Sequence, residues 1–249
     1  QYVCDGGSST TTMLTSYSTP PTSMGCDVGG SVIAHGLDNG DGGGTAANGQ
    51  LESGEVDYST TFCTKSTLLR IDIYPGINSG YTSYLTIFNN DLYFRAYDET
   101  NGEELWKYDG VNAPSMVADI RPGNNSSSPS ELTVFNNELY FVAYDGTNGH
   151  ELWKYDGTNA PSMVADIYSG ASSSYPSQLT VYNNELYFRA DDGTNGAELW
   201  KYDGTNAPSL VADIYSGNNG CYASYLTVFN NELYFLGTNG INGSELWKY

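Results

Sequence analysis

The chain has 249 residues, of which 29 are Asp or Glu and only 9 are Lys or Arg, so its formal net charge is -20 at pH 7. Such an acidic surface repels the phosphate backbone of nucleic acids and offers anionic membranes no attraction, which excludes both as partners. No stretch approaches the ~20 apolar residues of a membrane span, so membrane insertion is excluded as well. The length predicts two domains.

The composition favours a protein that works outside the cell. The chain contains 22 Tyr, is rich in Ser, Thr, Asn and Gly, and carries 4 Cys, an even number that favours oxidised pairs. We therefore predict an extracellular or cell-surface location, with cations, glycans or other proteins as partners. Candidate glycosylation sites, each opening an Asn-x-Ser triplet, are Asn124, Asn125 and Asn242.

Residues 1–65 form a Gly-, Ser- and Thr-rich segment that shares nothing with the rest of the chain. Its acidic residues include Asp38, Asp41, Glu52 and Glu55. Because hard cations select clustered carboxylate oxygens, these four side chains are a candidate calcium site. The pattern departs from an EF-hand, since Gly40 stands where an oxygen ligand is needed.

The segment from Cys26 to Cys63 carries the words Cys-Asp-Val-Gly-Gly, Asn-Gly-Gln-Leu and Thr-Phe-Cys at its start, centre and end. It resembles a small two-cysteine module of secreted bacterial proteins, and the resemblance implies that Cys26 pairs with Cys63. Residues 1–6 look like the last strand of a preceding copy, which leaves Cys4 without its own partner. We expect Cys4 to bond Cys221 within the chain, or, as the second choice, between neighbouring subunits.

The rest of the chain is one unit of 47 residues repeated four times. The word Glu-Leu-Trp-Lys-Tyr recurs in register around Trp106, Trp153, Trp200 and Trp247. The word Leu-Thr-(Ile/Val)-(Phe/Tyr)-Asn-Asn keeps the same interval, and so do the aspartates Asp72, Asp119, Asp166 and Asp213. Because self-similarity at a fixed period is typical of repeat architectures, this unit decides the fold.

Each unit predicts four strands and no helix. In the second unit the predicted strands are 132–135, 139–144, 151–155 and 163–167. Asn136 and Asn137 tolerate the left-handed backbone of a two-residue hairpin, and Asp-Gly-Thr-Asn words supply the other turns. No segment has an apolar period of 3.6 residues, so the chain is predicted to be all-β.

The strand 139–144 is apolar on both alternating faces, which indicates a sheet covered on both sides. Stacked four-stranded sheets of ~40 to 50 residues have the size of β-propeller blades. The fourth unit holds three strands, and a lone strand, 69–73, precedes the first unit. We therefore predict a four-bladed β-propeller over 66–249, with 69–73 completing the last blade. The alternatives are a larger ring or an open solenoid.

The repeated words Glu-Leu-Trp-Lys-Tyr-Asp-Gly, preceded by Asp-Gly-Thr-Asn-Gly, resemble the bacterial ELWxxDGT repeat family over residues 69–249. The resemblance implies a propeller-like fold in secreted or surface proteins with no settled catalytic role. Ala-Pro replaces the usual Gly-Thr after the motif, which affects a turn. The spacing is also similar to that of five-bladed propeller lectins, which bind one sugar per blade.

The sequence predicts no enzyme. His35 and His150 are the only histidines, and no nucleophile, phosphate-binding or metalloprotease motif occurs. We interpret the four repeated Trp as packing residues between blades, and the repeated Asp as turn residues. The expected function is a structural or adhesive module, the subunit of a head-to-tail fibre or a binder of other surface proteins. The alternative is a multivalent lectin, and calcium is the one candidate cofactor.

Overall fold

The computed structural model describes residues 13–19, 30–38, 49–53, 55–63, 71–74 and 78–249. The chain divides into two compact units, Gln1–Arg70 and Ile71–Tyr249, whereas the sequence placed the boundary between residues 65 and 66. The described residues contain strands and no helix, so the all-β prediction is confirmed. None of them forms a helix with the length and apolar character needed to cross a membrane.

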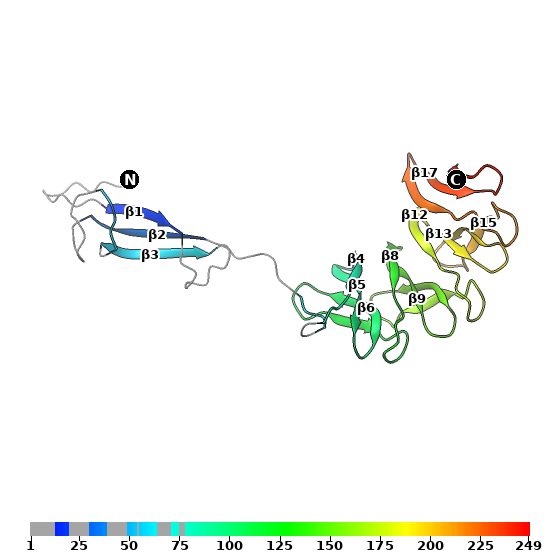
Figure 1. Ribbon diagram of the computed structural model, residues 1–249, viewed down its shortest axis with the longest axis horizontal. Helices are drawn as coiled ribbons and strands as arrows, with labels where there is room; N and C mark the ends of the chain where they lie inside the picture. The colour runs from blue at the N-terminus through cyan, green and yellow to red at the C-terminus, as the bar shows by residue number, and fades with distance from the viewer. Residues whose placement is uncertain (1–12, 20–29, 39–48, 54, 64–70, 75–77) are drawn as a thin grey trace. The chain divides into compact units, whose positions relative to one another are not determined.

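The first unit contains a three-stranded antiparallel sheet in the order β1 (Met13–Ser18), β2 (Gly30–Leu37) and β3 (Val56–Cys63) (Figure 1). The strands are rich in Val, Ile, Thr and aromatic residues, which fit a pleated sheet. A register shift between His35 and Gly36 interrupts the pairing of β2 with β3. There the backbone of Glu55 approaches Gly36 so closely that a side chain would not fit.

The second unit consists of four successive antiparallel sheets, which we call blades 1 to 4. Blade 1 comprises β4 (Ser83–Phe88), β5 (Asp91–Asp98), β6 (Gly102–Tyr108) and β7 (Ser115–Ala118). Blade 2 comprises β8 (Ser130–Phe135), β9 (Glu138–Tyr144), β10 (His150–Tyr155) and β11 (Ser162–Ala165). Blade 3 comprises β12 (Ser177–Tyr182), β13 (Glu185–Asp191), β14 (Ala197–Tyr202) and β15 (Ser209–Ala212). Blade 4 has β16 (Ser224–Phe229), β17 (Glu232–Thr238) and β18 (Ser244–Lys248).

The turns form as their residues predict. Asn136 and Asn137 have φ angles of 47° and 60°, the left-handed backbone that joins β8 to β9 in two residues. In the Asp-Gly-Thr-Asn turn after β10, Asp156 Oδ1 accepts hydrogen bonds from Thr158 N at 2.7 Å and Asn159 N at 2.8 Å. Hydrogen bonds from the Asn159 side chain and these N–H groups lower the pKa of Asp156.

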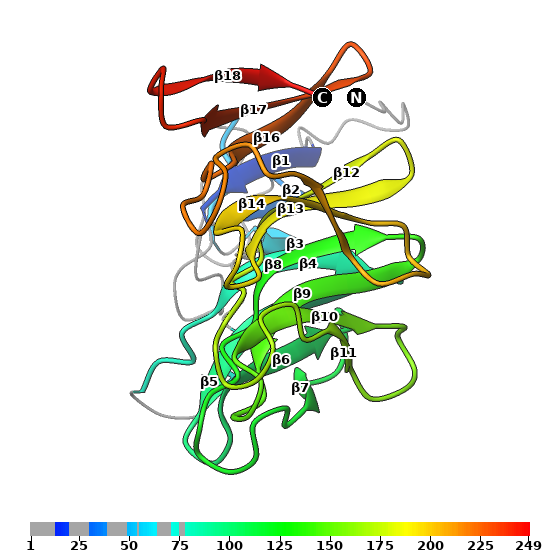
Figure 2. The ribbon, with the colours of Figure 1, turned by 90° about the vertical axis from the view of Figure 1, so that its right-hand side faces the viewer.

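The four blades follow one another in an open, curved row (Figures 1 and 2). The first strand of each blade contacts the first strand of the next, from β4 through β8 and β12 to β16. Among the described strands no comparable contact joins β16 to β4. The fold is thus a propeller-like series of blades, and the predicted closed ring is not confirmed.

The strand predicted at 69–73 is described only from Ile71 onwards, and there it is not a strand. Ile73 packs against Phe94 and Trp106 of blade 1 rather than extending blade 4. The reason lies in the repeat, because Ile120 packs in the same way against blade 2. Ile73 therefore belongs to the loop that enters blade 1.

Candidate functional site

The junctions between successive blades have apolar cores made from both sheets. At the first junction Phe88, Tyr93 and Leu105 of blade 1 form one buried cluster with residues of blade 2, namely Leu139, Phe141, Ala143, Trp153 and Tyr155. The ring of Tyr155 lies 6.5 Å from that of Phe88 and 5.9 Å from that of Tyr93, in edge and tilted arrangements that favour aromatic pairs. Burial of these rings holds the sheets together.

Trp153, Trp200 and Trp247 lie in the cores of the three junctions, whereas Trp106 packs with Phe94 and Ala96 within blade 1. Trp106, Trp153 and Trp200 are each 9% exposed, and Trp247 is half-buried. Within the described part of the chain the three buried indole N–H groups have no acceptor, whereas Trp247 Nε1 donates to Gly237 O at 2.9 Å. Rings enclosed in this way offer no flat surface for a sugar to stack on.

A buried glutamate forms the polar part of each junction. Glu151 is fully buried, and its carboxylate accepts hydrogen bonds from Ile167 N at 3.0 Å and Ser174 N at 2.8 Å. The Ser174 hydroxyl donates a third bond at 2.5 Å. Ile167 and Ser174 lie at the two ends of the loop between blades 2 and 3, so one side chain fixes the whole connection. We call the equivalent residues Glu104, Glu151 and Glu198 the junction glutamates.

The junction glutamates are kept from water. Burial raises the pKa of Glu104 to about 7, although hydrogen bonds from Ser127 and Ile120 act in the opposite direction. Burial raises the pKa of Glu151 as well. Because both oxygens of each carboxylate face loop donors, these groups stabilise the connection rather than meet a substrate.

The loop that ends each junction also bridges the two sheets through its backbone. Ser128 N donates to Glu103 O on β6 at 3.1 Å, and Tyr144 N on β9 donates to Ser127 O at 3.0 Å. The same two bonds recur at the second and third junctions, around Ser174 and Cys221. Successive blades are therefore joined by continuous backbone hydrogen bonding.

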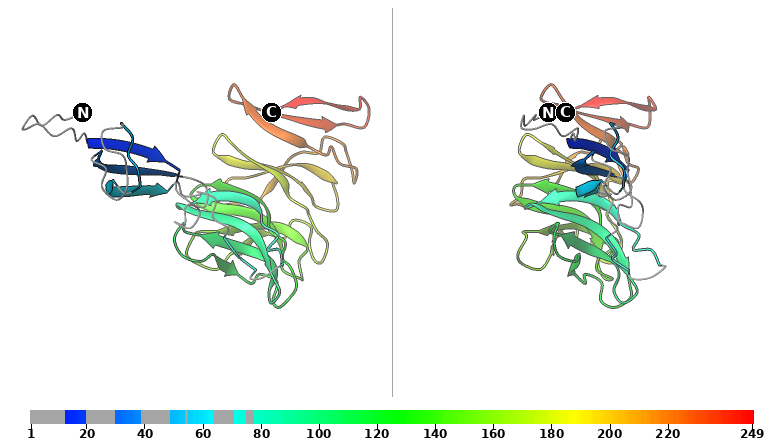
Figure 3. Two further views of the ribbon diagram at one scale, coloured as in Figure 1. Left: turned by 60° about the vertical axis from the view of Figure 1, so that its left-hand side comes forward. Right: turned by 90° about the vertical axis from the view of Figure 1, so that its left-hand side faces the viewer.

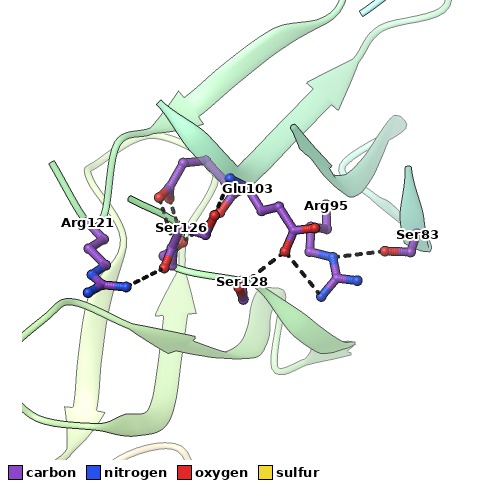
Figure 4. A network of polar contacts seen from close by, with 8 residues as sticks. Ser83, Arg95, Glu103, Arg121, Ser126 and Ser128 are labelled. Atoms are coloured by element: carbon purple, nitrogen blue, oxygen red, sulfur yellow. Dashed lines mark hydrogen bonds and ion pairs between the residues drawn. The ribbon is translucent and has the colours of Figure 1, made fainter. Parts of the chain in front are cut away.

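Side chains extend this bridge at the first junction (Figure 4). Glu103 Oε2 accepts a hydrogen bond from Ser128 Oγ at 3.2 Å and lies 3.8 Å from Arg95 Nη1. Arg95 Nε donates to Ser83 Oγ at 3.0 Å, and Ser126 Oγ accepts from Glu103 N at 2.9 Å. The network ties β4, β5 and β6 to the loop of the next blade.

His150 takes the place of Glu103 at the second junction. Its ring stacks between Tyr144 and Tyr175, with centroids 5.3 Å and 5.4 Å away. Burial lowers its pKa, and the charge of Arg121 acts in the same direction. The neutral imidazole thus serves as a packing group.

A glycine two residues before each junction glutamate lets the next loop approach. Gly102, Gly149 and Gly196 have φ angles of 73°, 74° and 68°, and a Cβ atom on any of them would collide with the backbone of the following loop. Sequence reasoning assigned no role to these glycines or to the junction glutamates. A charged residue that recurs inside an otherwise apolar strand, two residues after the glycine of an Asn-Gly pair, is the signal that identifies them.

The predicted disulfide residues lie mostly outside the described part of the chain. Cys4 and Cys26 are among the residues not described, as is the side chain of Cys63. Cys221 forms no disulfide with a described residue; it is 1% exposed, stands at the position that Ser174 has at the second junction, and its N–H donates to Glu198 at 2.8 Å. Both disulfide pairings stay predictions.

The candidate calcium residues are placed only in part. Asp38 and Glu55 are 2% and 1% exposed, and their carboxylates accept bonds from Gly49 N at 2.8 Å and Glu52 N at 3.2 Å. Asp41 lies outside the described residues. In the ranges that the structure describes, no group of three His, Cys, Asp or Glu side chains is placed to hold a metal. Calcium binding stays a prediction.

The other predicted positions lie on the surface or in turns. The repeated aspartates accept hydrogen bonds from a glycine N–H four residues on, at 3.1, 2.9 and 3.3 Å for Asp119, Asp166 and Asp213. The side chains of Asn124, Asn125 and Asn242 are exposed, as a glycosylation acceptor must be.

No protein-family model matches the chain, and no curated protein matches it. Solved structures are similar at low identity. The β-propeller domain of the Trilobed protease from Pyrococcus furiosus is 11% identical with a TM-score of 0.46, over 90% of this chain and 60% of that one. Acylaminoacyl peptidase from Pyrococcus horikoshii is 10% identical with a TM-score of 0.46, over 89% and 29%. The chain therefore spans less than two thirds of the length of either protein.

Proposed function

We propose that this chain is a non-enzymatic structural or adhesive module, working outside the cell as the repeating subunit of a surface or secreted fibre. One observation carries the proposal. Glu104, Glu151 and Glu198, the carboxylates that every complete junction repeats, are buried and bonded to connecting loops. A catalytic acid or base has to reach its substrate, whereas these groups hold blade to blade.

The remainder of the surface suits the same role. The chain is acidic throughout, and its turns are closed by Asp and Asn side chains such as those of Asp156 and Asn159. A surface with a large net negative charge keeps a protein soluble at high concentration. Turns closed by their own side chains need no ligand to hold their shape. Both features favour a durable scaffold.

The closed four-bladed ring predicted from the sequence remains a prediction within this proposal. It requires blade 4 to meet blade 1 of the same chain, with the segment around Ile73 between them. The opposite arrangement, in which blade 4 meets another molecule, leads to a fibre directly. The two arrangements differ in the oligomeric state that they predict.

Electron microscopy of native material tests the structural role. The expected result is filaments whose subunit has the mass of this chain, with Cys4-linked multimers on non-reducing electrophoresis if the disulfide joins subunits. Native material that remains strictly monomeric under all conditions would contradict the fibre. A hydrolytic activity that survives purification of the chain would contradict the non-enzymatic role.

A second function, glycan binding, is favoured by one surface hollow. This hollow of 240 Å³ is lined by Tyr175, Tyr222, Arg189 and Asp191, and the two tyrosines are 64% and 61% exposed. Exposed aromatic rings beside charged hydrogen-bonding groups are suited to sugars, because the rings stack on C–H faces and the polar groups bind hydroxyls.

Glycan-array binding with competition by free sugar tests this second function. Tyr175→Ala and Tyr222→Ala should each abolish binding if the hollow is a sugar site. Tyr17→Ala, at a ring 74% exposed on the other unit, is the matched control. Binding that both hollow variants retain would exclude the hollow as the site.

A further inference from the structure

The two ends of the row of blades present apolar faces that the inner blades keep covered. At the end of blade 4, Leu246 is 71% exposed and Phe229 is 62% exposed. The leucines equivalent to Leu246 in blades 1 to 3 are buried, at 0%, 0% and 1% for Leu105, Leu152 and Leu199. Phe229, Tyr234 and Leu246 line an apolar hollow of 420 Å³, and we call these three residues the forward face.

Blade 1 has the opposite free face at the other end. Leu85 is 62% exposed, and it lines a hollow of 160 Å³ with Ile73, Leu92, Phe94 and Tyr108. We call these five residues the backward face. Leu92 and Tyr108 are half-buried, whereas their equivalents in blade 2, Leu139 and Tyr155, are 0% and 7% exposed where blade 1 packs on them. Phe94 is already buried within blade 1, at 4% exposed.

The three inner junctions show what fits the forward face. Each joins the forward side of one blade to the backward side of the next, with the same residues 47 positions apart. At the first junction Tyr155 packs on Phe88 and Tyr93. The equivalent contact at the free ends is Tyr108 of a backward face on Phe229 and Tyr234 of a forward face.

The polar groups of a junction are also present at the two ends of the row. The glutamate lies in blade 4, and the N–H groups that would bind it lie at the entry to blade 1. Glu245 stands where the junction glutamates stand, yet it is exposed, and its carboxylate accepts no hydrogen bond from the described residues. The donors equivalent to those of Glu104 are the backbone N–H groups of Ile73 and Gly80 at the entry to blade 1. Gly80 O already accepts a bond from Tyr97 N at 2.7 Å, as Ser127 O does from Tyr144 N.

The space beside Gly243, where the inner junctions hold the following loop, is empty of described residues as well. Gly243 has a φ angle of 75°, like the glycines of the inner junctions, but a Cβ atom there would meet nothing within 4 Å. Gly102 and Gly149 in the same position touch the next loop. Blade 4 is therefore shaped for a following loop that no described residue provides.

Within the unit Ile71–Tyr249, blade 1 and blade 4 lie at opposite ends of the row (Figures 1 and 3), and each carries one of the two faces. No described strand of blade 1 is in contact with β16 to the extent seen at the inner junctions. Each molecule thus carries one free forward face and one free backward face, complementary to each other.

We propose that a second copy of this chain docks head to tail, placing its backward face on the forward face of blade 4 and its Ile73 and Gly80 N–H groups on Glu245. The contact is heterologous, so it repeats from copy to copy and produces a large ring or a filament. The inference rests on the proposed structural role and names the partner in that role.

Sedimentation velocity of the full chain over a range of concentrations tests the proposal with three variants. Leu246→Asp damages the forward face, Leu85→Asp damages the backward face, and Val111→Asp adds the same charge at a turn residue that is 86% exposed. All three positions are exposed, so circular dichroism and thermal unfolding should match those of the wild type at concentrations where the wild type is monomeric. The wild type and Val111→Asp should form a concentration-dependent series of oligomers.

Each face variant alone should self-associate about thirtyfold more weakly or worse, because a charge then enters the centre of the contact. An equimolar mixture of Leu246→Asp and Leu85→Asp should form dimers and nothing larger, since one intact face of each kind remains in the pair. A mixture without dimers would overturn the head-to-tail arrangement.

A wild type that is monomeric at every concentration would overturn the proposal in favour of closure within one chain. Filaments of the Leu246→Asp variant would overturn this docking surface and leave the structural role intact. Absence of filaments from native material would instead count against the structural role itself, so the two failures are distinguishable.

Discussion

Ser174 donates two hydrogen bonds to the buried carboxylate of Glu151, one from its backbone N–H at 2.8 Å and one from its hydroxyl at 2.5 Å. Glu151 also holds Ile167 N at the far end of the same loop. One side chain thus fixes the position of blade 3 relative to blade 2. The repeat of this arrangement at each inner junction makes the glutamate the first target for mutation.

Glu151→Ala should destabilise the chain by about 3 kcal/mol, because it leaves the N–H groups of Ile167 and Ser174 buried without an acceptor. Urea unfolding of dilute protein measures the change. Glu245→Ala is the matched control, since Glu245 has the same place in blade 4 but is exposed, and its effect on the dilute protein should be close to zero. Equal losses in the two variants would show that the hydrogen bonds to the loop contribute little.

The pKa of about 7 at Glu104, raised by burial from an ordinary value of 4.5, predicts a stability that depends on pH. Between these values the folded chain holds a proton that the unfolded chain has released, so stability falls as pH rises from about 4.5 to about 7. The full shift corresponds to about 3 kcal/mol.

Glu104→Gln removes this titration and keeps an oxygen acceptor. We expect the change in unfolding free energy from pH 5 to pH 8 to be more favourable in the variant than in the wild type, because the loss caused by Glu104 is absent. His150, whose pKa is lowered by burial, titrates in both proteins and cancels in the comparison. An unchanged pH dependence in Glu104→Gln would contradict the assignment.

Comparing Gly149→Ala with Gly243→Ala distinguishes the cost of backbone strain from the cost of a clash with the next loop. Both glycines have a φ angle near 75°, so alanine costs about 1 kcal/mol at either position. Only Gly149 also lies against the next loop, at Ser172 and Ser173. Gly149→Ala should therefore lower the thermal midpoint several degrees more than Gly243→Ala, and equal shifts would refute the close approach.

Cys221 should resist alkylation until the chain unfolds. Burial raises the pKa of its thiol to about 12, so the reactive thiolate is almost absent at pH 8. Mass spectrometry after iodoacetamide treatment, with and without urea, measures the labelling. Labelling of Cys221 in urea without reductant would exclude its predicted bond to Cys4, whereas labelling only after reduction would support that bond.

Much of the repeat unit could be predicted because local residues determine it. The strands and the Asn136–Asn137 turn follow from the backbone preferences of their residues. The strand predicted at 139–144 matches β9 to within one residue. The strand predicted at 163–167 ends at Ala165, because the N–H of Ile167 leaves the sheet to bind Glu151. That contact joins residues far apart in sequence, and propensity alone does not reveal it.

The arrangement of the blades could not be predicted in the same way. The number of units and their spacing are visible in the sequence, but whether they close depends on the angle between successive sheets. That angle is set by junction residues such as Glu104, Ser127 and Gly102, whose contacts appear only in the folded chain. For the same reason the junction glutamates, which lie within the most visible repeated word, were not recognised as a site.

Each junction is built from residues of two successive units, and this has an evolutionary consequence. The glutamate belongs to one 47-residue unit and the loop that it binds belongs to the next, so any unit can follow any other. Tandem duplication or loss of a unit in the gene would lengthen or shorten the row of blades, and every new junction would be built like the existing ones. Recombination can therefore change the number of blades in one step, and the new neighbours meet through the same glutamate and loop as before.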